Sequence, residues 1–223
     1  MELTYFGHAS FLLRAADGTT ILIDPYDASC GYPLPDAAPT AVTVSHEHFD
    51  HNFVLGVKGE PRVIRGLASE GNEWAQVDER VGQTRITTVP TYHDDSHGTQ
   101  RGRNAVFIFE VDGLRVVHAG DLGHLLDSKQ AHAIGRPDVL MIPIGGHYTI
   151  GPGEAEAVIA SLNPRLVIPM HYKTETTAGW PIGALDDFLR GKANVTRQGQ
   201  TVALSGDILR AAGAIWVLTH GGA

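Results

Sequence analysis

Hydrophobic residues in the first half of the chain occur in short runs that turn-forming residues interrupt. Short runs rich in Val, Ile, Thr, Leu and Phe are typical of β-strands. Asp17-Gly18 and Asp112-Gly113 each separate two such runs and predict hairpin turns. Four prolines fall within residues 25–39 and indicate a loop there. The pattern therefore predicts strands at residues 3–7, 10–15, 19–25, 40–45, 85–95, 104–111 and 114–121.

In the second half of the chain, strand patterns alternate with helical ones. The helix expected at residues 151–164 carries Glu154 and Glu156 near its start, where negative charge is favourable, and Asn163-Pro164 ends it. The other elements predicted for this half are a short helix at 183–191 and strands at 138–146, 165–173, 200–205 and 214–220.

This order of elements, with strands first and then strands and helices in alternation, predicts an α/β (α+β) fold of two packed sheets with helices outside. The chain is 43% hydrophobic and 19% charged, a balance typical of folded globular proteins and not of disordered ones. Because 223 residues suffice for a substantial core, we expect a single domain that spans residues 1–223.

The charge and the termini restrict the expected surroundings and partners. A net charge of -8 repels nucleic acid on average, so no nucleic-acid partner is expected. Cys30 is the only cysteine, which excludes an internal disulfide and fits a reducing compartment. The first residues lack the basic start and apolar core of an export signal, and no apolar run approaches the length of a membrane span. We therefore expect a cytoplasmic protein without a membrane partner.

The densest group of potential metal ligands follows the strand expected at 40–45, in the segment VTVSHEHFDHN. The helical zinc-protease motif H-E-x-x-H would need a histidine where this chain has Asp50, so that motif does not apply. Alternate residues of an extended or tightly turned segment point the same way, whereas His51 directly follows Asp50 and would point elsewhere. This spacing suggests two adjacent metal sites on one loop, with His46 and His48 in one and Asp50 and His51 in the other.

Three more potential ligands each follow an apolar strand pattern. His93 follows TTVPTY, Asp121 follows VVHAG and His171 follows LVIPM. Taken singly, each of them could equally be an ordinary loop histidine or turn aspartate. A strand that ends in a coordinating side chain holds that ligand rigidly, and together with the cluster at 46–51 the three complete a ligand set.

Several of these segments resemble the metallo-β-lactamase superfamily, namely Asp24-Pro25 after TILI, SHEHFDH, His93, HAGDLGH and IPMHYKT. GHASFLL and IPIGGHYTIGPGEA are similar to its cytoplasmic branch that includes ascorbate-6-phosphate lactonase. The resemblance covers roughly residues 2–175 and implies a four-layer αββα sandwich with a binuclear metal centre at its edge. It implies one site of His46, His48 and His93, a second of Asp50, His51 and His171, and Asp121 as the bridging ligand.

The ligand types also predict the chemistry. Imidazole and carboxylate mixtures favour zinc, with manganese or iron as alternatives. Two divalent ions about 3.5–4 Å apart can share a hydroxide with a pKa of about 7, which would attack a carbonyl carbon or phosphorus. Asp50 would also orient that hydroxide, so Asp50 and Asp121 are expected to be catalytic. The two cations outweigh these carboxylates and the hydroxide, so the site would accept an anionic substrate.

Other residues near these motifs have more than one interpretation. His147 is predicted to be an acid catalyst, and His8 and His118 either share that role or orient ligands. Tyr148 and Lys173 are candidates for contacts with the oxyanion or the substrate. Asp24 either orients a ligand histidine or caps a turn. His97, Arg101 and Arg103 lie on a loop that is either a lid or solvated, and the helix start at 151 either binds an anion or is an ordinary helix entry. His124, His132 and His220 are expected to be structural or exposed.

The favoured function is metal-dependent hydrolysis of a small ester, lactone or phosphorylated metabolite by the hydroxide of a binuclear centre. One alternative is a phosphodiesterase that acts on a nucleotide, nucleic acid or phospholipid. The acidic balance argues against nucleic acid, and no clearly amphipathic segment supports a lipid substrate. A second alternative is a non-catalytic metal-binding scaffold, against which the complete ligand set argues. The expected partner is a small molecule, and assembly into a homo-oligomer stays open.

Overall fold

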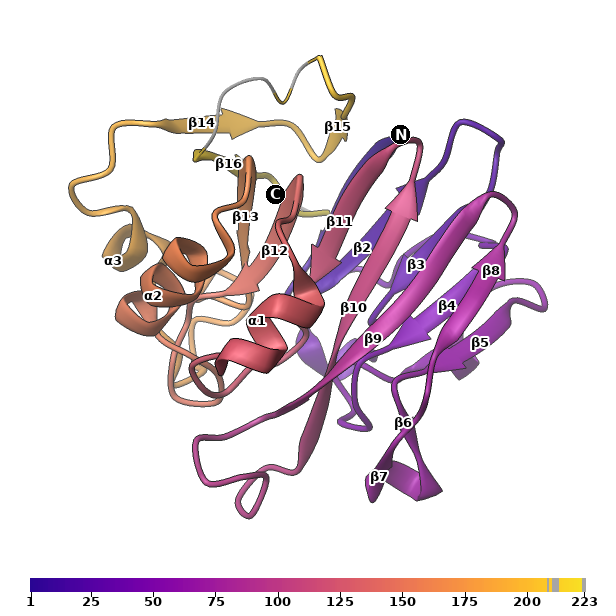
Figure 1. Cartoon of the computed structure of the whole chain (residues 1–223), viewed down its shortest axis with the longest axis horizontal. Coiled ribbons are helices and arrows are strands. Elements are labelled where there is room, and N and C mark those ends of the chain that lie inside the picture. The colour runs from indigo at the N-terminus through magenta and orange to yellow at the C-terminus, as the bar shows by residue number, and fades with distance from the viewer. Residues whose placement is uncertain (208, 210–212, 222–223) are drawn as a thin grey trace.

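The computed structural model describes residues 1–207, 209 and 213–221, which form two large β-sheets packed face to face (Figure 1). Among these residues the first sheet has six strands, in the order β15 (Thr201–Ala203), β1 (Glu2–Gly7), β2 (Ser10–Arg14), β3 (Thr20–Ile23), β4 (Ala41–Val44) and β5 (Arg62–Arg65). Over the same part of the chain the second sheet has eight, in the order β14 (Val195–Gln198), β16 (Ala214–Leu218), β13 (Leu166–Met170), β12 (Val139–Pro143), β11 (Leu114–His118), β10 (Arg103–Val111), β9 (Thr84–Tyr92) and β8 (Asp78–Val81). A short ribbon pairs β6 (Leu67–Ala68) with β7 (Glu73–Trp74).

Strand direction brings particular loops to one edge of the second sheet. β9, β10 and β11 pair antiparallel, so β9 and β11 run in the same direction. β11, β12 and β13 then pair parallel. The carboxyl ends of β9, β11 and β13 therefore lie at the same edge, and the loops that follow them lie close together.

The hydrophobic core lies mainly between the two sheets. Phe11 and Ile23 from the first sheet pack with Phe107, Phe109 and Met141 from the second, and all five are fully buried. Burial of such large apolar side chains is the dominant favourable term in folding.

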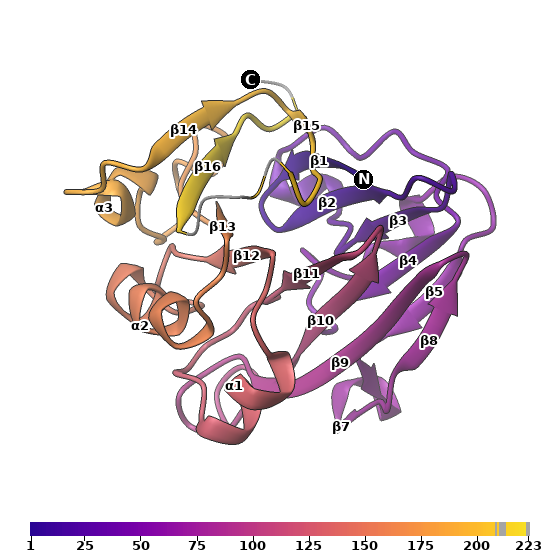
Figure 2. The same cartoon turned by 45° about the horizontal axis from the view of Figure 1, so that its top comes forward.

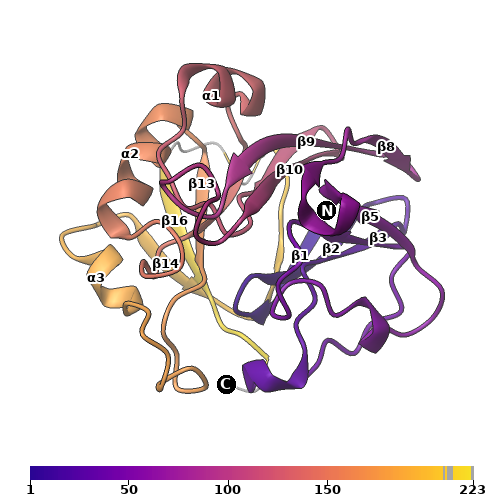
Figure 3. The same ribbon diagram turned by 90° about the horizontal axis from the view of Figure 1, so that it is seen from below.

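Further layers cover the outer faces of both sheets. Helices α1 (Ser128–Ile134), α2 (Pro152–Leu162) and α3 (Leu185–Leu189) lie on one side of the second sheet (Figure 3). The outer face of the first sheet buries Leu22, Val42 and Val44 against Val54 and Val57, at the 3₁₀ turn η2 (Val54–Gly56). The predicted layered α/β sandwich is confirmed, and a 3₁₀ turn and loops cover the first sheet at this point.

Two helices begin and end where local chemistry dictates. At α1, Asp127 accepts hydrogen bonds from the backbone of Lys129 and Gln130, and the Gln130 side chain accepts one from the Asp127 backbone, which forms a capping box. α2 begins with Pro152, which suits the first helical position, and ends at Asn163 in the left-handed conformation. The helices predicted at 151–164 and 183–191 are confirmed as the shorter α2 and α3.

Every predicted strand is also present, but several end earlier than the sequence indicated. The strands expected at 85–95, 114–121 and 165–173 end at Tyr92, His118 and Met170. The remaining residues of those three ranges form loops, because their side chains and backbone turn into the site described below.

The C-terminal part of the chain joins both sheets (Figure 2). β14 and β16 extend the second sheet, whereas β15 pairs antiparallel with β1 in the first. The backbone nitrogen of Met1 donates to the carbonyl oxygen of Leu204 at 3.1 Å, which fixes the first residues against this segment. None of the helices that the structure describes is long and apolar enough to cross a membrane.

Candidate metal centre

Four loops that follow strands meet at one edge of the two sheets. They follow β4 of the first sheet and β9, β11 and β13 of the second. Backbone hydrogen bonds join the sheets here: Ala105 N donates to Ser45 O at 3.1 Å, and His171 N donates to His8 O at 2.8 Å. These contacts fix the loop ends, so the side chains on them have defined positions.

Asp121 lies at the centre of the side chains that the four loops bring together. Its Oδ2 is 3.1 Å from Nε2 of His93, 3.2 Å from Nε2 of His171 and 3.9 Å from Nε2 of His46. Its Oδ1 is 3.2 Å from Nε2 of His51. One carboxylate thus faces four imidazole rings.

The other predicted ligands fall into two groups around Asp121. The ligand atoms of His46, His48 and His93 lie within 4.8 Å of one another. A second group, formed by His8, Asp50, His51 and His171, meets the same limit. The structure therefore brings all seven predicted ligands together and places His8 beside them, although a third set, Asp24, His46 and His51, meets the same limit and links the two groups.

Asp24 orients two of the histidines through hydrogen bonds. Its Oδ2 accepts from Ser45 Oγ at 2.6 Å and from His51 Nδ1 at 2.9 Å, while its Oδ1 accepts from Ser45 N at 2.8 Å. Because the Ser45 hydroxyl donates to Asp24, it accepts from His46 Nδ1, 2.9 Å away. Both rings thus carry their proton on Nδ1, which leaves Nε2 free to bind a cation. Of the two interpretations of Asp24, the geometry supports the orienting one.

Several buried polar atoms in this cluster have no hydrogen-bond partner among the described residues. They are Nε2 of His46 and His51, Nδ1 of His8, His93 and His171, and Oδ1 of Asp121. An unsatisfied buried polar group costs about 1–3 kcal/mol, so a natural fold rarely leaves several together. Divalent cations would satisfy the Nε2 and carboxylate atoms that converge here, and the donor set fits zinc, manganese or iron.

The ionisation of the cluster also favours a cation. Burial lowers the pKa of His46 well below its usual value, and the neighbouring His51 lowers it further. Burial raises the pKa of Asp121, but His171 and His51 outweigh it and hold that pKa well below the ordinary value. For His51, burial lowers the pKa, but the carboxylates of Asp121 and Asp50 more than reverse this. The buried carboxylates of Asp121 and Asp50 thus favour positive charge at this position, which a bound cation would supply.

His8 supports the second group of ligands. Its Nε2 is 3.0 Å from Asp50 Oδ2, and its ring packs 4.2 Å from that of His171 and 5.3 Å from that of Trp180. Burial lowers the pKa of His8 to about 4, and the neighbouring His171 adds to this, so the ring is neutral near pH 7. A neutral ring with its proton on Nε2 donates to Asp50 and thereby fixes the orientation of that carboxylate.

Two glycines allow the ligand loops to approach their neighbours closely. A Cβ at Gly123 would overlap the backbone of His93 and Asp94, and one at Gly145 would overlap the carbonyl oxygen of His171. Any larger residue at these two positions would displace a ligand segment.

A cavity of about 720 Å³ opens beside the cluster. Five of the predicted ligands reach it, namely His48, Asp50, His93, Asp121 and His171. The rest of its lining comes from outside the ligand set: Ser29, Phe49, Arg101, Tyr148, Gly179, Trp180 and Pro181. A small molecule could therefore reach the metal ligands directly from this cavity.

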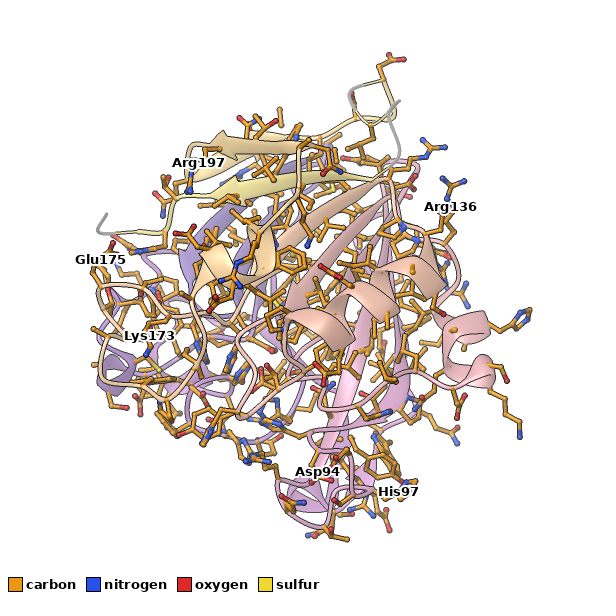
Figure 4. All side chains as sticks on the ribbon, turned by 90° about the vertical axis from the view of Figure 1, so that its left-hand side faces the viewer. Asp94, His97, Arg136, Lys173, Glu175 and Arg197 are labelled. Carbon is orange, nitrogen blue, oxygen red and sulfur yellow. The ribbon has the colours of Figure 1, made fainter. Side chains whose placement is uncertain are left out.

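The structure does not bring His147 together with the seven ligands. His147 is exposed and lines a second hollow of about 450 Å³, whereas its neighbour Tyr148 lines both hollows. Lys173 also lies outside the cavity, in a separate hollow with Glu175 and Arg197 (Figure 4).

The other candidate histidines have structural contacts. His118 is buried between Ala9 O, 2.8 Å from its Nε2, and the backbone N–H of Gly120, which donates to its Nδ1. His124 accepts from Tyr92 N at 3.1 Å and donates to Leu125 O at 2.7 Å. In each ring, both nitrogens form hydrogen bonds with backbone groups, which leaves neither ring available for catalysis.

Sequence reasoning did not single out Phe49 or Trp180 as cavity residues. Phe49 is 52% exposed, and its position between His48 and Asp50 in the ligand segment is the sequence signal that could have indicated a cavity residue. Trp180 follows His171 by nine positions and reaches the cavity through a loop, so no local pattern predicts its place.

Comparison with known proteins agrees with this site. A family model described as the β-lactamase superfamily domain matches residues 2–171. The chain belongs to the metallo-β-lactamase superfamily, and the predicted fold is confirmed.

Two curated relatives and one solved structure narrow this assignment. The chain is 33% identical over 229 residues to a UPF0173 metal-dependent hydrolase of Anaeromyxobacter sp. strain K, covering 87% of this chain and 82% of the relative. It is 32% identical over 210 residues to a UPF0173 metal-dependent hydrolase of Pyrococcus furiosus, covering 83% and 88%. A Thermotoga maritima structure, described as a zinc-dependent hydrolase of the metallo-β-lactamase superfamily, is 36% identical with a TM-score of 0.76 over 97% of each chain. The chain is therefore a metal-dependent hydrolase of the UPF0173 family.

Proposed function

We propose that this enzyme hydrolyses a small ester, lactone or phosphorylated metabolite with a pair of divalent ions, zinc before manganese or iron. The observation that carries the proposal is the position of Asp121, whose carboxylate lies within 4 Å of His46 and His93 from one group and of His51 and His171 from the other. A single ion would leave part of this ligand set unused.

The chain's own residues divide the work. His46, His48 and His93 would hold one ion, and Asp50, His51 and His171 would hold the other, with Asp121 between them. When bound, the ions would supply Lewis acidity and lower the pKa of water to about 7. Asp24 holds His46, through Ser45, and His51 in the tautomer that leaves Nε2 unprotonated, and His8 holds Asp50 toward the cavity.

The resemblance to the ascorbate-6-phosphate lactonase branch supports a lactone or phosphorylated sugar acid among the candidate substrates. A catalytic role for His147 stays a prediction, because this side chain faces the second hollow. We further propose that the enzyme acts as a single domain in the cytoplasm, which its lone cysteine, Cys30, supports.

Elemental analysis of the purified protein, combined with a substrate screen, tests the proposal. We expect about two metals per chain and turnover of at least one class among lactones, phosphate esters and phosphodiesters. Asp121→Ala should lose both turnover and metal loading while circular dichroism stays unchanged. Metal-free protein that cannot be reconstituted would overturn the binuclear centre, and turnover in Asp121→Ala would overturn the bridging role.

A further inference from the structure

The cavity beside the metal ligands combines aromatic surface with one cationic side chain. Phe49, Tyr148 and Trp180 provide aromatic surface. Among the described lining residues, one side chain is a lysine or arginine, and it is Arg101. The only carboxylates in the same lining are Asp50 and Asp121, both of which belong to the metal site. Beyond the metal ligands, the cavity therefore offers an apolar surface and one positive charge.

The loop that carries Arg101 is fixed by an internal carboxylate. Oδ1 of Asp94 accepts from the backbone N–H groups of Ser96 and Gly98, and its Oδ2 accepts from those of Gln100 and Arg101, all within 3.0 Å. Asp94 is buried, although Figure 4 shows it and His97 on a loop at one end of the molecule, far from Arg136. These four hydrogen bonds fix the loop and the backbone of Arg101. This agrees better with a fixed binding element than with a mobile lid.

The side chain of Arg101 is also restrained, but it is not neutralised. Its guanidinium carbon lies 5.7 Å from the centre of the Tyr148 ring, within the range of a cation–π contact. Several arginines of the described chain pair with a carboxylate, such as Arg62 with Glu79 and Arg115 with Glu110, whereas others, such as the exposed Arg136, do not. No such ion pair is found for Arg101 among the described residues. In a protein of net charge -8, this unpaired and half-buried arginine faces the cavity without a built-in anion.

We propose that Arg101 binds an anionic group of the substrate, a carboxylate or a phosphate, while Phe49 and Trp180 contact its apolar part and the bond to be hydrolysed lies at Asp121. The proposal rests on the proposed hydrolase function and adds a substrate class to it. The substrate is an ester or lactone with a negative charge at a fixed distance from the reacting carbonyl. The planar guanidinium suits both anions, because each can accept two parallel hydrogen bonds.

The charges around Arg101 argue for this direction of binding. Arg101 and Tyr148 line both the cavity and the neighbouring hollow, and Asp95 and Glu154 line that hollow as well. These two carboxylates repel an anion from the hollow, whereas in the cavity Arg101 and the metal ions would attract it together. A neutral substrate would gain nothing from Arg101, so the two kinds of substrate can be compared directly.

The test uses pairs of esters that differ only in one distant charge. Mono-(4-nitrophenyl) esters of adipic, pimelic and suberic acid are compared with the neutral esters in which the free carboxyl group is methylated and the 4-nitrophenyl ester is kept. In the same way, 4-nitrophenyl 6-phosphonohexanoate is compared with its dimethyl phosphonate. Hydrolysis by metal-loaded enzyme is followed by release of 4-nitrophenol, after subtraction of the uncatalysed rate. We expect kcat/KM to favour the anion of each pair by about 10- to 100-fold at one preferred chain length, as charged hydrogen bonds predict. The arm with the larger preference identifies the anion as carboxylate or phosphonate.

Arg101→Gln should remove this preference, with a higher KM for the anionic esters and unchanged values for the neutral ones. Arg101→Lys should restore part of it. Arg136→Gln is the matched control, because it removes the same charge from an exposed arginine whose hydrogen bond goes only to Asn163 O. The inference is overturned if the parent enzyme shows no preference, or if the preference survives in Arg101→Gln.

A binding measurement keeps the two proposals separate. Calorimetry of 6-phenylhexanoate with the metal-loaded protein should give a dissociation constant about tenfold weaker in Arg101→Gln than in the parent. Unchanged binding would mean that the carboxylate binds the metals alone and would overturn the role of Arg101. If Arg101 affects binding but no ester, lactone or phosphate ester is hydrolysed, the anion site is supported and the proposed reaction fails.

Discussion

Replacement of Asp24 by asparagine tests whether the metal affinity depends on the orientation of the histidines. Asparagine has nearly the volume of aspartate, so the buried site keeps its packing. However, the amide places an NH₂ group where one carboxylate oxygen stood. If that group replaces Oδ2, it faces Ser45 Oγ and Nδ1 of His51, both of which donate to Asp24 in the parent. The histidine can then form a hydrogen bond only by moving its proton to Nε2, the atom that should bind the metal.

The expected magnitude follows from this change of tautomer. Loss of an orienting partner of a metal-bound histidine typically weakens metal affinity about 10- to 100-fold. That range corresponds to about 1.4–2.8 kcal/mol. It agrees with the cost of about 1–3 kcal/mol for an unsatisfied buried polar group, so both estimates describe the same loss. The fold should persist, because the hydrophobic core between the sheets does not include Asp24.

Chelator competition provides the assay. The dissociation constant of each metal is measured for the parent, for Asp24→Asn and for Asp78→Asn, while circular dichroism checks the fold. Asp78 is the control because it lies on the edge strand β8 and pairs with Arg85 at the surface. The reasoning is wrong if Asp24→Asn binds two metals with the affinity of the parent, or if Asp78→Asn is weakened to the same extent.

Further predictions concern the supports of the same site. His8→Ala should weaken metal binding about 10- to 100-fold, whereas His8→Gln, which keeps a donor for Asp50, should weaken it less; equal effects in chelator titration would contradict the role of the hydrogen bond. Gly123→Ala should reduce the metal content, because its methyl group overlaps the backbone of His93; full loading by elemental analysis would refute this. Removal of metal with a chelator should lower the melting temperature, since free metal at about 1,000 times its dissociation constant stabilises by about 4 kcal/mol, or about 8–16 °C for a chain of this size. Calorimetry that gives the same melting temperature with and without metal would argue against cations at the cluster.

The convergence of the seven candidate ligands could be predicted from the sequence because their positions depend on local patterns. Four of them lie at 46–51 after β4, the other three lie within three residues of the ends of β9, β11 and β13, and the direction of those three strands places their ends at one edge. By contrast, the contact of His8 with Asp50 joins residues 42 positions apart, from the loop between β1 and β2 and the loop after β4. No spacing within the sequence specifies such a pair. The same reason hid Trp180, whose loop reaches the cavity from beyond β13.

The elements that sequence reasoning missed lie mostly at the edges of the sheets. β5, β8 and β14 are the last strands at three sheet edges, and each buries few side chains. In β8 only Val81 is buried, so the alternation that identifies a strand is absent. α1 similarly buries only Ile134, and its signal lies in the capping box at Asp127 instead of in a hydrophobic face. Hydrophobic periodicity reports burial, and these elements have little of it.

The pairing of β15 with β1 has a consequence for how the enzyme matures in the cell. Thr4 and Thr201 are hydrogen-bonded partners separated by 197 positions, so β1 receives one of its neighbours only after this long stretch of chain has been made. The other large sheet is likewise incomplete until residues 214–218 have been made. Contacts between such distant segments form slowly. The nascent chain therefore carries all seven candidate ligands, at positions 46 to 171, before either sheet has all the strands that hold those ligands in place.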